Sequence, residues 1–252
     1  MSTRNPDVSV VIPCHNEEAN LRQLYGELRA VLDAQPVAYE IVITDDGSTD
    51  GSWAVLKDLA SHDARLRAQR LARNCGESTA SWVGMRTARG VYILTIDADL
   101  QNDPRDIPRF LAELNHSDCV CGTRINGRGR GDNLMRRIAS SIANAVRNRV
   151  TSEHITDSGC TYRAFRRECL DGIRPFDGMH RFLPSLISMN GYKVAEIAVA
   201  NRPRVAGKAH YGVLNRVFRA TLDLLAVRWM KARMIRYEVA DRCGDQEQIE
   251  RR

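Results

Sequence analysis

The segment Asp97–Gln101, with the sequence Asp-Ala-Asp-Leu-Gln, holds the residues of this chain that are best suited to chemistry. It offers two carboxylates and an amide oxygen at alternate positions, and oxygen donors of this kind suit Mg²⁺ or Mn²⁺. The run before it, Val91–Ile96, is apolar and rich in β-branched residues, which predicts a buried strand. Because ligands of open α/β sheets bind at the carboxyl ends of the strands, the pattern favours a divalent cation that holds a diphosphate. An isolated acidic pair after a strand is more often a polar turn, so the interpretation depends on the rest of the chain.

Two further predicted strands end in polar residues. Val8–Ile12 predicts a first buried strand followed by Pro13–Glu17, and Tyr39–Ile43 predicts a second strand followed by Asp45 and Asp46. Carboxylates at such positions can accept hydrogen bonds from a nucleobase or a ribose. Each segment alone is typical of a helix start or a capping turn. Together, polar ends on strands one, two and four of one sheet would converge on a single cleft, which capping alone does not explain.

The first 125 residues alternate between predicted strands and helices. The expected strands cover residues 8–12, 39–43, 66–71, 91–96 and 119–123. Four helices are expected between these strands. One begins at Asn16, one contains Trp53, one ends at about Gly90 and one begins at Pro104. This alternation predicts an α/β fold with a mostly parallel, Rossmann-like central sheet and helices on both faces.

The pattern changes after Arg124. A Gly- and Arg-rich stretch over residues 125–132 predicts a loop, and residues 133–150 predict a helix. We expect residues 1–211 to form the α/β domain and residues 212–252 to form a basic amphipathic C-terminal helix, over 212–236, with a polar tail. The apolar face of that helix would consist of Leu214, Val217, Phe218, Thr221, Leu222, Leu225 and Trp229. Such a face is equally compatible with packing on the domain and with docking on a membrane surface.

The composition and charge of the chain limit the kinds of partner and the compartment that can be expected. The chain has 252 residues, a formal net charge of +6 and a pI of about 9.1, which suits nucleic acid, an anionic membrane or phosphorylated substrates. Arginines concentrate in residues 124–149 and 202–236 with few aromatic residues between them, which disfavours nucleic acid as a partner. Seven scattered cysteines without a CxxC pair indicate a reducing compartment rather than disulfides or zinc. With no signal sequence and no apolar run of about 20 residues, we expect a cytoplasmic protein, peripheral on the cytoplasmic face of the membrane.

Three motifs in order carry a family resemblance: residues 8–17, residues 45–51 and residues 97–101. Together they resemble the inverting family 2 glycosyltransferases, in particular the dolichol-phosphate mannose synthase and bacterial polyprenyl-phosphate glycosyltransferase type, over about residues 7–215. The resemblance implies a GT-A fold, a nucleotide-sugar donor such as GDP-mannose or a UDP-hexose, a Mg²⁺ or Mn²⁺ cofactor and a polyprenyl or dolichyl phosphate acceptor. It also implies contact with an anionic membrane or with a membrane partner protein.

The resemblance assigns roles to individual residues. Around the nucleotide sugar it places Pro13, His15, Glu17, Asp46, Asp97, Ala98, Arg204, Lys208 and His210. The metal ligands would be Asp97, Asp99 and Gln101, and the acceptor phosphate would contact Arg124 and Arg137. Catalysis would depend on Asp97, Asp99, Arg124 and Arg204.

This chain departs from the family pattern at some positions. Position 15 is more often tyrosine in this branch, and Ala209 and His210 stand where the family has serine and lysine. The segment Asp157–Arg163 matches the acceptor segment of the branch only loosely.

The identity of the acceptor divides the hypotheses. A lipid phosphate is already anionic at neutral pH, because its second pKa is about 6, and it therefore needs no strong general base. A hydroxyl of a growing cell-envelope glycan would instead require an acidic residue facing the acceptor, near Asp157. A non-catalytic nucleotide-sugar binding protein would be favoured by loss of the metal carboxylates, yet Asp97 and Asp99 are both present.

Overall fold

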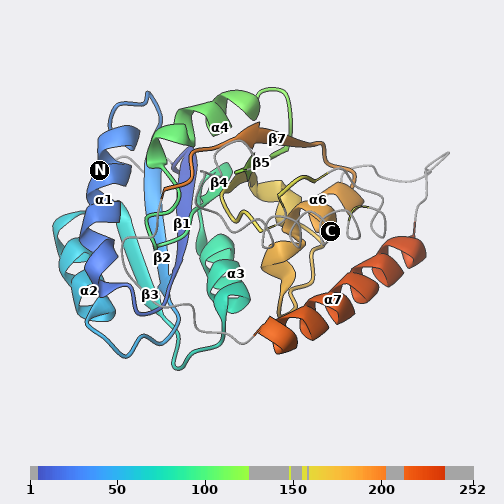
Figure 1. The fold of residues 1–252 in the computed structure, drawn as a ribbon. Coiled ribbons are helices and arrows are strands. Elements are labelled where there is room, and N and C mark those ends of the chain that lie inside the picture. The colour runs from blue at the N-terminus through green and yellow to red at the C-terminus, as the bar shows by residue number, and fades with distance from the viewer. Residues whose placement is uncertain (1–4, 125–147, 149–154, 158, 203–212, 236–252) are drawn as a thin grey trace, which may run out of the picture.

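Seven strands form one central sheet in the computed structural model, which describes residues 5–124, 148, 155–157, 159–202 and 213–235 (Figure 1). The strands are β1 (Val8–Cys14), β2 (Tyr39–Asp45), β3 (Leu66–Arg70), β4 (Tyr92–Thr95), β5 (Cys119–Thr123), β6 (Arg163–Arg166) and β7 (Val194–Ala198). Their order across the sheet is β3-β2-β1-β4-β6-β5-β7. All neighbouring pairs are parallel except those of β6, which runs antiparallel to β4 and β5. The prediction of a mostly parallel sheet is therefore confirmed.

Helices cover both faces of the sheet, as expected. The longer helices are α1 (Glu18–Leu32), α2 (Ser52–His62), α3 (Glu77–Thr87), α4 (Ile107–Glu113), α6 (Leu183–Met189) and α7 (Val213–Arg233). Short 3-10 turns are η1 (Pro104–Asp106), η3 (Arg167–Leu170) and η4 (Met179–Arg181). Apolar side chains of α1, α2 and α4 pack on one face in one core, while those of α3 and α6 pack on the other face in a second core. Burial of both faces explains why β1 and β2 are apolar almost throughout.

Several details differ from the sequence-based expectation, including Val91, which precedes β4 and is exposed rather than part of a buried strand. Strand β1 does not end before Pro13 but continues to Cys14, and Pro13 pairs with Thr44 of β2. Proline has no N–H to donate, but the pairing of β1 with β4 has already ended at Val11, so the strand continues against β2 alone. The strands β6 and β7 were not expected, because each is short and neither has a long apolar run. Apart from the helical residue Asn148, the predicted loop over 125–132 and helix over 133–150 lie outside the described residues.

The helix α7 lies at the edge of the fold farthest from α1 and α2 (Figure 1). Several of its residues contact the domain: Val227 is fully buried, Met230 packs against the second core, and Asp223 lies 3.7 Å from the guanidinium of Arg181. Leu222, Leu225 and Trp229, which belong to the predicted apolar face, are exposed by 51%, 56% and 64%. These three side chains are therefore largely exposed, while the choice between packing on the domain and membrane docking for the helix as a whole stays a prediction. Within the described part of the chain, no helix has the length and hydropathy needed to cross a membrane.

Candidate functional site

The three polar strand ends meet at one edge of the sheet, as predicted. Strands β2, β1 and β4 are neighbours, so the residues after Cys14, Asp45 and Thr95 leave the sheet side by side. The first two segments also contact each other, because His15 Nδ1 lies 2.9 Å from the carbonyl oxygen of Asp46. Since that carbonyl only accepts, Nδ1 carries the proton, and Nε2 can accept from Asn16 Nδ2 at 3.3 Å. The His15 ring is therefore fixed by two hydrogen bonds at the carboxyl end of β1.

Asp46 holds a loop that sequence reasoning did not assign to the site. Its buried carboxylate accepts hydrogen bonds from the backbone N–H groups of Cys75 at 2.7 Å and Gly76 at 2.8 Å, just before α3. Gly47 has a φ of +65°, and a Cβ there would lie 2.5 Å from the carbonyl carbon of Arg73. Only glycine permits so close an approach in this left-handed conformation. The signal in the sequence was the polar loop after β3, a fourth strand end beside the other three. The predicted nucleotide contact of Asp46 stays a prediction.

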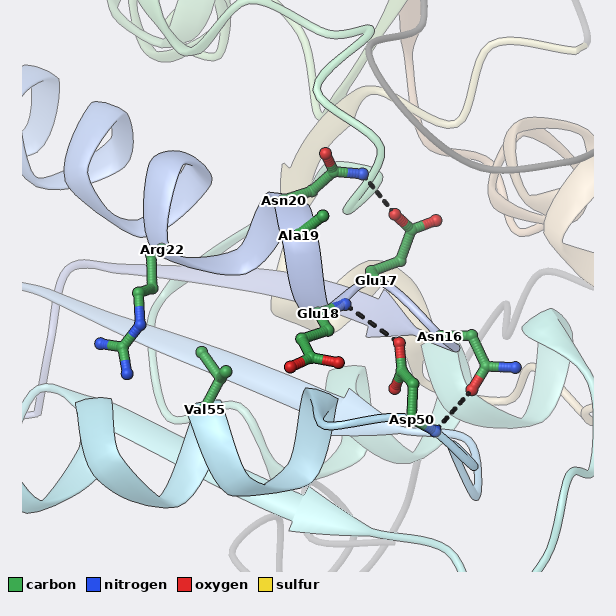
Figure 2. Close-up of a pocket in the computed structure, with 8 residues that line it drawn as sticks. All are labelled: Asn16, Glu17, Glu18, Ala19, Asn20, Arg22, Asp50 and Val55. Carbon is green, nitrogen blue, oxygen red and sulfur yellow. Dashed lines mark hydrogen bonds between the residues drawn. The ribbon is translucent and has the colours of Figure 1, made fainter.

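A hollow of about 560 Å³ opens beside the site, between the beginnings of α1 and α2 (Figure 2). Its lining consists of Asn16, Glu17, Glu18, Ala19, Asn20, Arg22, Asp50 and Val55. Glu17 Oε2 accepts a hydrogen bond from Asn20 Nδ2 at 2.6 Å, and Asp50 Oδ2 accepts one from the N–H of Glu18 at 3.2 Å. Three carboxylates against one arginine make this hollow unfavourable for an anionic diphosphate. The strand ends suit that ligand better.

Asp97 and Asp99 follow β4 in a tight turn, in which Leu100 has a left-handed φ of 63°. Asp97 Oδ2 accepts a hydrogen bond from Thr161 Oγ1 at 2.5 Å and a long one from Asn102 Nδ2 at 3.4 Å. Asp99 is buried, and its Oδ1 accepts the N–H of Gln101 at 3.1 Å. Ala98 between them is buried as well.

The electrostatics of this pair suit a cation. Burial raises the pKa of Asp97, the hydrogen bond from Thr161 lowers it, and the Asp99 carboxylate raises it, so it lies above its ordinary value. A divalent cation between the two carboxylates would offset the cost of burying their negative charge and the repulsion between them. Among the described residues, no group of three His, Cys, Asp or Glu side chains is arranged to hold a metal. A cation here would therefore use the two aspartates with oxygens of Gln101, water or a bound diphosphate.

Arg124, just after β5, forms a nearly buried ion pair. Its Nε and Nη2 donate to the two carboxylate oxygens of Asp157 at 2.9 and 3.2 Å, and its backbone N–H also donates to Asp157. Burial lowers the pKa of the Arg124 guanidinium most strongly, but the hydrogen bonds to Asp157 and the nearby negative charges, including that of Asp157, together outweigh this effect and hold the pKa above its ordinary value. Asp97 also contributes to this rise through its charge. Arg124 is thus a fixed cation near the aspartate pair.

The remaining predicted site residues, Arg137, Arg204, Lys208 and His210, lie outside the described residues. The chain that leads to Arg204 is nevertheless tied to the aspartate turn. Asn201 forms a β-bridge with Asn102, and the N–H of Arg202 donates to the carbonyl of Gln101 at 2.9 Å. The described chain therefore reaches Arg202 beside Gln101, one of the predicted cation ligands.

Solved structures of glycosyltransferases share this architecture. A mannosyltransferase from Pyrobaculum calidifontis, solved with GDP-Man and Mn²⁺, matches with a TM-score of 0.60 and 22% identity over 91% of this chain and 65% of that one. A glucosyl-3-phosphoglycerate synthase from Mycobacterium tuberculosis, solved with Mn²⁺, UDP and phosphoglyceric acid, matches with a TM-score of 0.64 and 18% identity over 92% and 80%. The central sheet and its helices therefore form the GT-A fold.

Sequence comparison places the chain more narrowly. The family model for glycosyl transferase family 2 matches residues 9–174, and the chain belongs to this family. An undecaprenyl-phosphate 4-deoxy-4-formamido-L-arabinose transferase from Aeromonas hydrophila is 36% identical over 82% of this chain and 64% of its own length. A dodecaprenyl-phosphate galacturonate synthase from Rhizobium johnstonii is 35% identical over 88% of this chain and 66% of its own length. The chain thus spans slightly less than two thirds of these relatives.

Proposed function

We propose that this protein is a metal-dependent, inverting glycosyltransferase that moves a sugar from a nucleotide-diphosphate sugar to a polyprenyl phosphate. The observation that carries the proposal is the crowded pair Asp97 and Asp99 at the end of β4, beside the polar ends of β1 and β2. The names of the two curated relatives support the acceptor class, because both include a polyprenyl phosphate. The two solved structures support a divalent cation and a nucleotide on the donor side, because one contains GDP-Man with Mn²⁺ and the other contains UDP with Mn²⁺.

The residues of the chain would divide the work between donor and acceptor. Asp97, Asp99 and Gln101 would hold the cation, which supplies positive charge for the diphosphate leaving group. Pro13, His15, Glu17 and Asp46 would shape the nucleotide side, directly or through the 73–76 loop. Arg204, with Lys208 or His210, would add charge at the diphosphate. Arg124 and Arg137 would orient the acceptor phosphate, whose oxygen is anionic at neutral pH and attacks without a general base.

The pairing of Asp157 supports a phosphate acceptor over a hydroxyl acceptor. A hydroxyl acceptor needs a carboxylate base near Asp157, and Asp157 is the acidic residue that the structure describes in that stretch. Its two oxygens instead hold Arg124 as a cation directed near Asp97. An oriented arginine suits an anionic acceptor.

We also propose that α7 brings the enzyme to an anionic membrane on its cytoplasmic face. The exposed side chains of Leu222, Leu225 and Trp229 share a helix with the basic residues Arg228 and Lys231. Apolar insertion combined with cationic attraction is the usual basis of peripheral membrane binding. A membrane partner protein that covers the same face is the competing explanation.

A donor screen tests the central proposal. Thermal unfolding is measured with GDP-mannose, UDP-glucose and UDP-N-acetylglucosamine, each with and without Mn²⁺, and transfer is then measured to a polyprenyl phosphate in detergent. We expect one donor to raise the melting temperature only with Mn²⁺, and Asp99→Asn to abolish both this rise and transfer, because one carboxylate ligand is lost. Asp58→Asn, which removes an exposed carboxylate on α2, is the matched control.

The two halves of the proposal fail separately. If no nucleotide sugar stabilises the protein with Mn²⁺, the donor site is wrong. If a donor binds with Mn²⁺ but the sugar reaches only a glycan hydroxyl, the acceptor is wrong and the donor site stands.

A further inference from the structure

Thr161 lies directly opposite Asp97 because of the antiparallel pairing of β6 with β4. Thr95 pairs with Arg163, and Leu94 pairs with Ala164. Continuing this register by two residues past the end of the ladder places residue 161 across from residue 97. The position of the threonine beside the first aspartate therefore follows from the sheet itself.

Thr161 is held on both sides. Its carbonyl oxygen accepts a hydrogen bond from Thr95 Oγ1 at 2.6 Å, which fixes the backbone against the end of β4. Its own Oγ1 donates to Asp97 Oδ2 at 2.5 Å. The second donor to this carboxylate, Asn102 Nδ2, reaches the same oxygen. Among the described residues, Oδ1 receives no hydrogen bond, so the two oxygens of Asp97 are in different environments.

This asymmetry matters for a metal ligand. A carboxylate side chain has two rotatable bonds, and a cation binds more tightly when the productive rotamer is already set. A hydrogen bond to one oxygen orients the other, and loss of such a supporting partner typically costs 10- to 100-fold in metal affinity.

We infer that Thr161 is the positioning residue of the cation site: its hydroxyl holds Asp97 Oδ2 and thereby presents Oδ1 to the metal. This inference rests on the proposed function, because it assumes that Asp97 is a metal ligand. It adds a residue of the 155–163 segment to the donor side of the site. Asp157, four positions before Thr161, holds Arg124, so these two residues support one group on the predicted donor side and one on the predicted acceptor side.

Mn²⁺ binding tests the inference without reference to activity. The concentration of free Mn²⁺ is followed by its electron paramagnetic resonance signal, in titrations with Mn²⁺ alone and with UDP or GDP present. Thr161→Val keeps the shape of the side chain and removes the donor, and we expect about a tenfold weaker Mn²⁺ affinity. Thr161→Ser keeps a hydroxyl and should stay within about threefold of the wild type. Thr87→Val is the matched control, because it removes a partly buried threonine hydroxyl at the far end of α3 and should leave Mn²⁺ affinity unchanged.

A kinetic signature separates positioning from general damage. In Thr161→Val the concentration of Mn²⁺ needed for half-maximal transfer should rise, while saturating Mn²⁺ restores kcat. A merely structural role would lower kcat at every Mn²⁺ concentration.

Asp97→Asn separates failure of this inference from failure of the proposed function. If Asp97→Asn abolishes Mn²⁺ binding while Thr161→Val binds Mn²⁺ like the wild type, the role of Thr161 is wrong and the cation site stands. If Asp97→Asn leaves Mn²⁺ binding intact, the cation site itself is wrong. Should Thr161→Val fail to fold, Thr161→Ala takes its place, and wild-type Mn²⁺ affinity in that variant would equally overturn the inference.

Discussion

Replacing Asp157 with asparagine tests whether the Arg124 ion pair organises the acceptor side of the site. The Asp157 carboxylate is 2% exposed and accepts three hydrogen bonds from Arg124, of 2.9, 3.2 and 3.2 Å. Asparagine keeps one acceptor oxygen but turns an N–H group toward the guanidinium, and it removes the negative charge. We therefore expect Asp157→Asn to lower the free energy of unfolding.

The structure sets the size of this effect. A hydrogen bond to a charged group contributes about 1.5–3 kcal/mol, and breaking a buried ion pair by removing one partner costs about 3–5 kcal/mol. The Arg124 side chain is 22% exposed, so water can partly solvate its guanidinium after the Asp157 charge is removed. We place the loss near the lower end, at about 2–3 kcal/mol, which corresponds to about 5–10 °C in melting temperature for a chain of this size.

A double-mutant cycle measures the coupling. Urea unfolding is compared for wild type, Asp157→Asn, Arg124→Gln and the double variant, and we expect a coupling energy of at least about 1 kcal/mol. The exposed pair of Arg22 and Asp58, at 2.7 Å, is the control cycle and should show less than about 1 kcal/mol because solvent screens it. If the effects of Asp157→Asn and Arg124→Gln add to within about 0.3 kcal/mol, the pair does not organise this region and the reasoning fails.

Two further predictions concern pH and the membrane. Burial raises the pKa of Asp103, but hydrogen bonds from two arginines hold it at about 2, below its ordinary 3.8. Its negative charge therefore stabilises the fold above about pH 4, and this contribution is lost as the pH falls through 2. In urea titrations, Asp103→Asn should lower the free energy of unfolding by about 1–2 kcal/mol at pH 7 and by progressively less below pH 4. A loss that does not depend on pH would contradict this. Leu225→Glu/Trp229→Glu should fold normally and lose sedimentation with anionic liposomes at low salt, whereas Ala54→Glu/Ser61→Glu, with the same charge change on α2, should still bind. Equal binding by both double variants would rule out α7 as the docking face.

The sequence by itself determined the framework of the site. Apolar runs bounded by polar residues mark β1, β2 and β4, because a strand buried on both faces must be apolar and must end where polar residues begin. The alternation with helices implies parallel strands, and parallel strands bring their carboxyl ends to one edge. The convergence of Pro13–Glu17, Asp46 and the Asp97–Gln101 turn could therefore be predicted from local patterns alone.

Sequence periodicity could not decide which side of α7 faces the domain. The helix carries apolar residues on more than one side, and the domain takes Val227 while Leu225 and Trp229 stay exposed. The close approach of Gly178 to Asp223 accompanies this orientation, since a Cβ at Gly178 would lie 2.4 Å from the Asp223 carboxylate. The orientation of a helix depends on the shape of the surface against which it packs. The sequence pattern of the helix contains no information about that surface.

Only the tertiary structure decided the partners of the charged residues. Asp97 and Thr161 are 64 positions apart, and Arg124 and Asp157 are 33 apart. These contacts depend on β6 running antiparallel between β4 and β5, and its four residues carry too little pattern to reveal that direction. Hydrophobic periodicity reports which face of an element is buried, whereas register between distant strands is chosen by the packing of the whole sheet. For this reason the sequence alone predicted the aspartates, and the fold supplied the threonine and the carboxylate that hold Asp97 and Arg124 in place.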